Sequence, residues 1–458
     1  MPIQFKKPEY TKNFPKWELV RAFVDEDIEK LPKLLRKIDA SDTSNENTER
    51  NKEYKDSAVL INITKRTHDG GIGAVFRKEG EIELPASIEY LKDDTNGAGM
   101  NIEQFSKKVV SNTSQTGRGG LLTEFPEIPD DFKRTVDNMK EKKAFIIEYT
   151  AEQIINWTFT HGKLTMVILE EVVEDKVDEY ETKACNQWRE LRLVDGVYWQ
   201  AVHREVNEKV ELISAHMVTD FNGKALTEIT FSFVGTINND HELDPSLFYS
   251  IAAINKGHYR NSADLEENCF VHGQLTLGIS TSLDADAWKE ANPTGVKVGA
   301  RKGHYLGEGG SFTSVQAEAN QLADKLMERK EQQMLSIGAR LIEPGGNERE
   351  VAVLARVGAE TATLSSLTHN VSDAMSQCLL WAEGYMNPTV TENIYILNQE
   401  FFPKNMDPQS MMAMIQQFDR GLIAESDVHK NNVKSSLVSA DRTLEDIKEE
   451  VANQAPGI

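Results

Sequence analysis

The most regular apolar pattern in the chain lies between residues 364 and 385. Apolar side chains recur there at alternating spacings of three and four, which is the period of one face of an α-helix. The positions are Leu364, Leu367, Val371, Ala374, Cys378, Trp381 and Tyr385. This coiled-coil-like seam predicts a helix that packs against a partner helix, either from the same chain or from a neighbouring copy.

A different pattern, in which β-branched and aromatic runs are broken by turn dipeptides, occupies residues 144–234. Asp195-Gly196 separates two of these runs, and Asp-Gly between alternating apolar residues is a strong signal for a tight hairpin. His161-Gly162 marks a second turn. The pattern predicts an antiparallel β-rich module.

Three further helices are predicted from the signals at their ends. Residues 101–104 match a capping box, which predicts a helix over residues 101–112. Asp244 followed by proline supplies an N-cap and a first helical residue, and so predicts a long helix over residues 244–270. Another helix is predicted from about residue 315 to residue 337, and Gly338 stops it.

Other segments lack a clear period. Residues 41–56 are polar and predict a solvated loop or a surface helix. The three glycines of segment 70–73 predict turns. Residues 282–312 predict a long loop with one helical turn near Trp288, and loops of that length are usually functional or disordered.

Together these elements predict a mixed α+β fold in five successive parts. A mixed α/β part over residues 1–155 is followed by a β-rich module over 156–240, a long helix over 241–275, a loop and helices over 276–390, and a helical tail over 391–458. In the tail, Asp407-Pro408 is expected to start a Met-rich helix, and Asp441 is expected to cap a last charged one.

Composition limits the kind of partner. The chain has 458 residues, with 51 Lys and Arg against 73 Asp and Glu, for a net charge of -22. This balance argues against a broad basic face that grips phosphates. The three cysteines are scattered and are expected to be small buried residues in a reducing compartment. No signal sequence or long apolar run is recognised, so a cytoplasmic site of synthesis is expected.

Motifs for catalysis and metal binding are not recognised in the sequence. The Gly-Lys pairs lack the remainder of a P-loop, and the glycine-rich segments 116–120 and 307–311 are interpreted as backbone turns. The ten histidines show no metal-ligand spacing, and adjacent acids such as Asp93-Asp94 point apart. We therefore expect no catalytic residue, no metal, no cofactor and no enzymatic activity.

One segment, residues 250–264, resembles the signature helix of one lineage of tailed-bacteriophage portal proteins. The resemblance rests on a Tyr-Arg-x-Ser-Ala-Asp core, which is formed here by Tyr259, Arg260, Ser262, Ala263 and Asp264. Arg260 and Asp264 are four residues apart and share a helix face, in the weaker order for an ion pair. The small Ser262 and Ala263 would allow close approach of a neighbouring helix.

Other blocks resemble the same family in the same order, over roughly residues 50 to 440. They are residues 54–67, 73–78, 116–122, 154–157 and 334–341, and the helix around Asn370. Two departures stand near the fourth block. The family pattern has Arg-Pro before it and a basic residue after it, whereas this chain has Lys143-Ala144 and Thr158.

The resemblance implies a portal-like α+β subunit with a mixed α/β wing, a β-rich clip-like module, a long stem helix and a helical C-terminal crown. It implies a closed ring of about twelve copies at one capsid vertex, assembled in the bacterial host cytoplasm and then part of the virion. Double-stranded DNA would pass through the ring during packaging and ejection. Terminase, the major capsid or scaffold protein and a head-tail adaptor would be the protein partners, with no membrane.

The same resemblance makes residues 282–312 a channel-facing loop. Four basic residues there are candidates for transient contacts with DNA phosphates, or else simple solubility charges of a loop: Lys289, Lys297, Arg301 and Lys302. The acidic balance fits a conduit, because strong phosphate neutralisation would hold the DNA in place.

Two other functions stay open at this stage. Another virion structural protein, such as a capsid or scaffold component, would share the acidic charge and the missing motifs. A DNA-packaging nuclease or motor subunit is the second alternative, against which the missing P-loop counts. Imaging separates rings from shells, and assays of ATP hydrolysis and plasmid cleavage test the enzymes.

Overall fold

The computed structural model describes most of the chain, and its residues form two compact units. The described residues are 2–126, 135–139, 141–176, 178–206, 209–273, 276–293, 305–315, 322–338, 350–399, 401, 408–434, 438 and 442–453. Unit 1 comprises Met1–Tyr10, Asp69–Pro245 and Arg349–Ile458, and unit 2 comprises Thr11–His68 and Ser246–Glu348. Both units combine segments that are far apart in sequence, whereas the five predicted parts follow one another along the chain. The assignment of these parts to wing, clip, stem and crown stays a prediction.

Unit 1 contains two main antiparallel sheets. One has the order β3-β2-β9, formed by β3 (Phe145–Thr150), β2 (Arg118–Glu124) and β9 (Phe231–Gly235). The other has the order β4-β5-β6-β7-β8, formed by β4 (Ile154–Thr160), β5 (Lys163–Lys176), β6 (Thr182–Val194), β7 (Val197–Val206) and β8 (Lys209–Met217). Asp195 and Gly196 have φ of 50° and 82° and join β6 to β7, which confirms the predicted hairpin.

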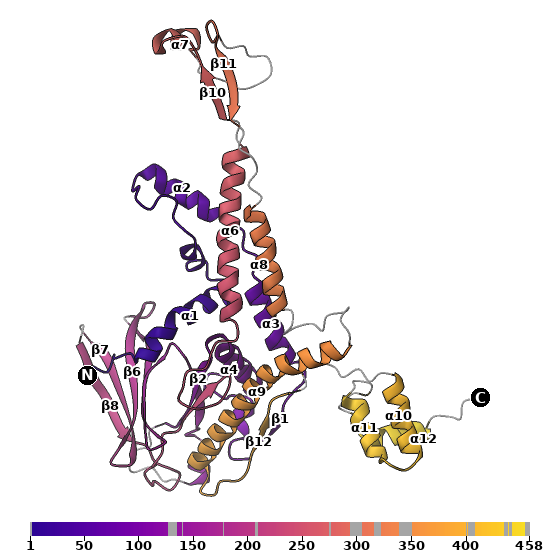
Figure 1. Ribbon diagram of the computed structural model, residues 1–458. Helices are drawn as coiled ribbons and strands as arrows, with labels where there is room; N and C mark the ends of the chain where they lie inside the picture. The colour runs from indigo at the N-terminus through magenta and orange to yellow at the C-terminus, as the bar shows by residue number, and fades with distance from the viewer. Residues whose placement is uncertain are drawn as a thin grey trace. The chain divides into compact units, whose positions relative to one another are not determined.

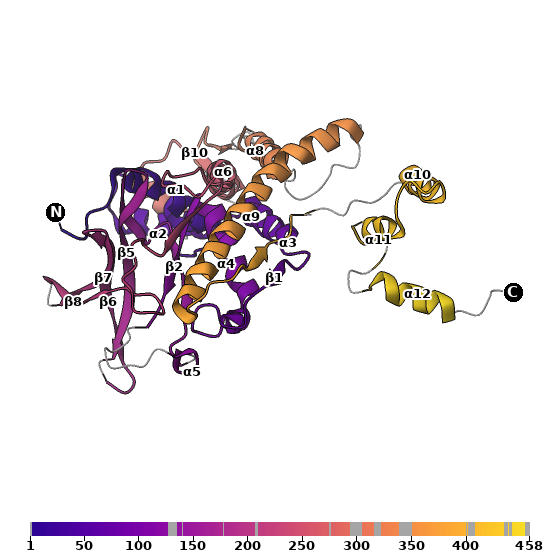
Figure 2. The same ribbon diagram turned by 90° about the horizontal axis from the view of Figure 1, so that it is seen from below.

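Helices cover the smaller sheet of unit 1. Helix α4 (Ile102–Thr116) begins where predicted, because the Asn101 side chain accepts a hydrogen bond of 2.8 Å from the Gln104 N–H. Helix α9 (Glu350–Met386) packs against α4, β2 and β9 (Figure 2). It also packs against β12 (Ile394–Ile396), which pairs with β1 (Glu81–Glu83) in a separate two-stranded sheet (Figure 1). Two short helices, η2 (Glu89–Lys92) and α5 (Val136–Met139), complete this part.

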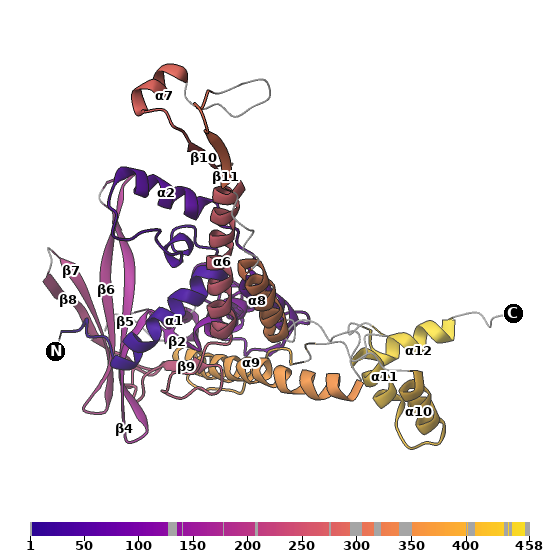
Figure 3. The same ribbon diagram turned by 45° about the horizontal axis from the view of Figure 1, so that its top comes forward.

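Unit 2 is built on two long helices that lie side by side, α6 (Tyr249–Gly273) and α8 (Leu322–Gly338) (Figure 1). Between them in sequence, β10 (Thr276–Ser280) and β11 (Ser311–Val315) form an antiparallel hairpin that carries α7 (Ala285–Ala291) (Figure 3). Most of α1 (Pro8–Val24), then η1 (Leu31–Leu34) and α2 (Asn45–Asp56), complete the unit. Its core includes Val20, Phe23, Leu31, Tyr54, Phe248, Ile251, Tyr259, Ala263 and Met334.

Several predicted boundaries are wrong for identifiable reasons. Asp244 does not cap the long helix, which begins only at Tyr249, because its carboxylate instead accepts hydrogen bonds from the Ile237 and Asn238 N–H groups at 2.7 and 3.2 Å. The predicted loop 282–312 does contain a helical turn at Trp288, but strand pairing extends into its end. Residue 315 accordingly ends a strand instead of starting α8.

The glycines of segment 70–73 also lie in a helix, α3 (Ile63–Val75), and not in turns. A Cβ atom added at Gly71 would stand 4.0 Å from the Leu364 side chain, which is an ordinary contact, so space alone does not require glycine there. Glycine lowers helix propensity by only about 1 kcal/mol per residue, and tertiary context overrides it in α3. Residues 41–56 contain the surface helix α2, which was one of the two predicted alternatives. Among the cysteines, Cys378 is buried as expected, Cys185 is half-buried, and Cys269 is exposed on the solvent side of α6.

The described residues of the C-terminal tail form three helices, α10 (Pro408–Asp419), α11 (Glu425–Lys434) and α12 (Leu444–Asn453). Gly421, with φ of 69°, follows α10 in the left-handed conformation that commonly ends a helix. Asp441 lies outside the described residues, and Thr443 caps α12 by accepting a hydrogen bond from the Asp446 N–H at 3.2 Å. None of the helices in the described ranges has the length and apolar character that a membrane crossing requires.

Candidate functional site

The residues that carry the family resemblance meet in unit 2, around α6. Asn255 is fully buried there, and its Oδ1 accepts hydrogen bonds from the Thr64 N–H and hydroxyl at 3.1 and 3.0 Å. The Asn255 Nδ2 donates to the Ile61 carbonyl at 2.9 Å. One side chain thus fixes the segment that leads into α3, and satisfies backbone groups that would be costly to bury alone.

The signature core of α6 extends this polar contact. The Ser262 hydroxyl donates to the Val59 carbonyl at 2.7 Å, and the Tyr54 hydroxyl donates to the Asp264 carboxylate at 2.7 Å. Burial raises the pKa of Tyr54, and the Asp264 carboxylate beside it acts in the same direction. Segment 54–64 is therefore held along α6 by side chains from three turns of the helix. We call this set of contacts the α6 node.

Arg260 and Asp264, which share a face of α6, bind different partners. The Arg260 Nε donates to the Leu34 carbonyl at 2.7 Å, while Asp264 accepts from Tyr54. The small Ser262 lies against the extended segment around Val59, to whose carbonyl it donates. Tyr259 is 5% exposed and Ala263 is fully buried in the core of unit 2.

Helix α6 is also tied to α8. The Lys330 ammonium donates to the Gly257 carbonyl at 2.9 Å, and a Cβ atom at Gly257 would stand only 3.1 Å from that nitrogen. Burial lowers the pKa of Lys330, and the positive charge of Arg36 lowers it further. Burial also lowers the pKa of His258, which is 1% exposed and lies near Glu331, whose charge opposes the shift.

The predicted seam of α9 is buried within unit 1. Six of its residues are at most 2% exposed: Leu364, Leu367, Val371, Ala374, Cys378 and Tyr385. The seventh, Trp381, is half-buried and donates from its indole N–H to Glu228 at 2.9 Å. The partner belongs to the same chain and consists mainly of sheet β3-β2-β9, α4 and β12. The predicted partner helix is thus only a part of what covers the seam.

Arg118 is a structural residue that the sequence analysis missed. It is 2% exposed, and its guanidinium lies 3.8 Å from the ring centre of Phe233. Its Nη1 donates to the carbonyls of Asp240 and Glu242 at 3.3 and 2.6 Å. Burial lowers the pKa of Arg118 to about 9, although Asp240 and Asp244 act in the opposite direction. The glycine-rich segment 116–120 predicted only a turn. The partners of Arg118 are backbone carbonyls, and the side-chain types of the sequence do not indicate which carbonyls will be bound.

The four candidate DNA-contact residues are not brought together among the described residues. Lys289 lies in the last turn of α7. Lys297, Arg301 and Lys302 lie outside the described residues. Their predicted role stays a prediction.

An uncovered apolar surface lies on one face of the larger sheet of unit 1. Trp199 pairs with Met217, and His203 pairs with Leu212, so these side chains point to the same side. Trp199 is 37% exposed, Met217 42%, Leu212 58% and Val210 38%. We call these four residues the β8 face. Since β8 is an edge strand, its backbone is also open on one side.

Metal binding finds no support among the described residues, which contain no group of three or more His, Cys, Asp or Glu side chains placed to hold an ion. The geometry therefore consists of packing contacts and uncovered surfaces.

Comparisons with known proteins add a partial family match. Residues 248–386 match the family described as Domain of unknown function (DUF4055). These residues include α6, the β10-β11 hairpin, α8 and α9, and therefore the signature core and the seam. No curated protein matches the chain.

Two solved structures show a distant likeness. A chain in the neck of an empty GTA particle, computed with C6 symmetry, is 10% identical, with a TM-score of 0.42 over 82% of this chain and 89% of that chain. A chain in the neck of a native GTA particle, computed with C12 symmetry, is 11% identical, with a TM-score of 0.41 over 83% of this chain and 91% of that chain. Scores below 0.5 do not establish a shared fold, so the residues and geometry of this chain carry the functional argument.

Proposed function

We propose that this chain is the subunit of a portal-type ring, a virion structural protein that frames a conduit for double-stranded DNA at one capsid vertex. The observation that supports this most strongly is the α6 node. Two blocks of the family resemblance, residues 54–67 and 250–264, are about two hundred positions apart in sequence and yet are hydrogen-bonded to each other through Tyr54, Asp264 and Asn255. Residues from two separate blocks of the resemblance are thus in direct contact in the folded chain.

Uncovered apolar side chains support an assembled state. The β8 face in unit 1 is one example. In unit 2, Leu322, Leu326 and Ile337 are 62, 38 and 38% exposed. At 100° per residue they fall within about 60° of each other around α8. Monomeric proteins rarely leave such rows open, and sister subunits in a ring would cover them.

The charge of the chain supports passage of DNA in place of tight binding. A net charge of -22 per copy leaves few cations to neutralise phosphates, so the ring would let the duplex slide. The proposed role needs no catalytic centre, no metal and no cofactor. Terminase, capsid or scaffold protein and a head-tail adaptor would dock on the outside of the ring.

Electron microscopy and mass photometry of the purified full-length protein test the proposal. Closed rings of about twelve copies with a central hole are the expected result. Shells or sheets would instead indicate a capsid or scaffold component, and a stable monomer under assembly conditions would overturn the proposal. Hydrolysis of ATP, or cleavage of a plasmid with magnesium, would indicate a packaging enzyme.

Binding of duplex DNA by the assembled ring gives a second test. We expect weak binding at physiological salt with a shallow dependence on salt concentration, because few counterions are released. Tight binding with a steep salt dependence would contradict a conduit in which the DNA slides.

A further inference from the structure

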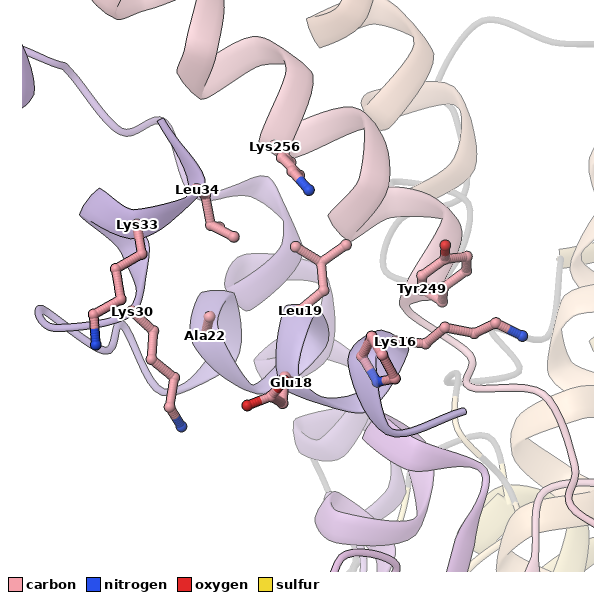
Figure 4. A pocket seen from close by; sticks show the side chains of 10 residues that line it. Lys16, Glu18, Leu19, Ala22, Lys30, Lys33, Leu34, Tyr249 and Lys256 are labelled. Atoms are coloured by element: carbon pink, nitrogen blue, oxygen red, sulfur yellow. The ribbon is translucent and has the colours of Figure 1, made fainter. Parts of the chain in front are cut away.

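A cavity of about 390 Å³ in unit 2 combines an apolar floor with a basic rim (Figure 4). The floor contains Leu19 and Ala22 from α1 and Leu34 from η1. Four lysines surround it, and Figure 4 shows them on different sides of these apolar residues: Lys16, Lys30, Lys33 and Lys256. Glu18 is the one acid among the lining residues, so the cavity has an excess of three positive charges in a chain that is strongly acidic overall.

Two of these lysines are available to a ligand. Lys30 forms an ion pair with Asp27 at 3.2 Å, and Lys16 donates to the Asn13 side chain at 3.0 Å. Within the described part of the chain, Lys33 and Lys256 form neither an ion pair nor a side-chain hydrogen bond. Lys33 is exposed and Lys256 half-buried, on opposite sides of Leu34 (Figure 4).

The combination of floor and rim indicates the chemistry of the ligand. A DNA backbone would engage the lysines and leave the apolar floor uncovered, and a small inorganic anion would do the same. An amphipathic helix uses both parts, because its apolar side chains fill the floor and its acidic side chains meet the lysines. The cavity therefore suits an acidic amphipathic helix.

The chain itself contains such a helix. In α12, Leu444 and Ile447 are three residues apart and half-exposed, and the sequence continues this row at Val451. Four acids and one lysine give α12 a net charge of -3, which matches the excess in the cavity. Glu445 and Glu449 are exposed and form no ion pair among the described residues.

We propose that the lysine-rimmed cavity of one copy binds helix α12 of a neighbouring copy. The inference rests on the proposed ring, because a ring brings a second copy close to every cavity. Copies that each carry a net charge of -22 repel one another, so assembly requires local contacts of opposite charge at their interfaces. The contact between this cavity and α12 is one that the chain can supply for itself.

Charge reversal tests the contact in the full-length protein. The cavity variant Lys33→Glu/Lys256→Glu and the helix variant Glu445→Lys/Glu449→Lys are each expected to raise the protein concentration needed for ring formation about tenfold. The protein that combines all four substitutions should recover assembly. The matched control Lys12→Glu/Lys52→Glu carries the same charge change outside the cavity and should assemble like wild type.

A synthetic peptide of residues 442–453 tests the contact independently of ring formation. We expect it to bind the wild-type protein, to bind the cavity variant about tenfold more weakly, and to bind less as salt is raised. If wild type forms rings but neither the peptide nor the variants show these effects, the contact is wrong and the proposed ring stands. If wild type forms no rings, the proposed function fails even where the peptide binds.

Cross-linking of mixed copies identifies the source of the helix. In a Cys269→Ser background, one isotope-labelled copy carries Lys33→Cys and an unlabelled copy carries Glu449→Cys. A link between labelled and unlabelled chains is expected. In a protein that carries both Lys33→Cys and Glu449→Cys, links found only within single chains would overturn the assignment to a neighbouring copy. Binding of a duplex oligonucleotide to the cavity in place of the peptide would also overturn the proposal.

Discussion

Helix α9 and strand β8 belong to the same unit, and both carry rows of apolar side chains. The α9 seam is covered by its own chain, with Val371 and Leu367 fully buried. The β8 face is open, with Leu212 58% exposed. The α9 row has the helical spacing of three and four, whereas the β8 face has the strand spacing of two from Val210 to Leu212 and is interrupted by a β-bulge before Met217. The spacing shows which side chains share a face, but not whether the same chain covers that face.

The largest effect on folding is expected at the α9 seam. Val371→Asp places a carboxylate in a fully buried apolar site, which should lower the free energy of unfolding by about 4 kcal/mol or more. Urea unfolding followed by circular dichroism measures this. Thr363→Asp puts the same charge on an exposed position of α9 and should be nearly neutral. Equal effects of the two substitutions would show that burial of the α9 seam does not determine the cost of the introduced charge.

A smaller loss in the free energy of unfolding is expected at the α6 node, where the contacts are hydrogen bonds between polar groups. Asn255→Leu leaves the Thr64 N–H and the Ile61 carbonyl without partners and should cost about 2 to 3 kcal/mol. Hydrogen exchange of residues 59–64 should rise with it. Gln332→Leu, on the exposed side of α8, makes a similar change in shape without loss of a buried partner. A neutral Asn255→Leu variant would mean that water replaces these bonds at little cost.

A pH-dependent effect of about 1 kcal/mol per pH unit is expected from His258. Its folded pKa lies below 6.5, so the unfolded chain binds more protons in the interval between the folded pKa and 6.5. Stability should therefore fall as the pH is lowered through this interval. His258→Asn should flatten the pH profile of unfolding, while His369→Asn, at an exposed position on α9, should leave it unchanged.

The smallest effect on folding, and a large one on assembly, is expected at the β8 face. Leu212→Asp should change the free energy of unfolding by less than about 0.5 kcal/mol, because the side chain is mostly in water. If sister copies cover this face, the fraction of protein in rings, measured by mass photometry, should fall sharply. Ser214→Asp lies on the other face of the same strand and serves as the control. Normal ring formation by Leu212→Asp would show that the β8 face is not an interface between copies.

The sequence predicted those elements whose signals are local. The Asp195-Gly196 hairpin and the Asn101 cap depend on residues within a few positions, and both are confirmed. Asp244 carries the same kind of signal but is used by a loop at Ile237 and Asn238, a competition that pattern alone does not resolve. The strands of the β10-β11 hairpin are too short to show a period.

The candidate site was located from the sequence, but its partners were not. Tyr259 through Asp264 were singled out as a packing core, whereas Ser262 and Arg260 bind the backbone carbonyls of Val59 and Leu34. Every residue has such a carbonyl, so residue type gives no indication of which one is bound. The same reasoning applies to Arg118, whose partners are the carbonyls of Asp240 and Glu242.

The cover of sheet β3-β2-β9 has a consequence for synthesis on the ribosome. Strand β2 is complete at residue 124 and β9 at residue 235, but the helix that buries their apolar side chains ends only at Met386. For more than a hundred residues of translation the growing polypeptide exposes Leu121 and Val234, which lie on the face of the sheet where Thr123 bonds to α9, to solvent and to other nascent chains. Host chaperones that shield apolar segments would be needed most during this interval, and a premature stop before α9 would yield an aggregating product.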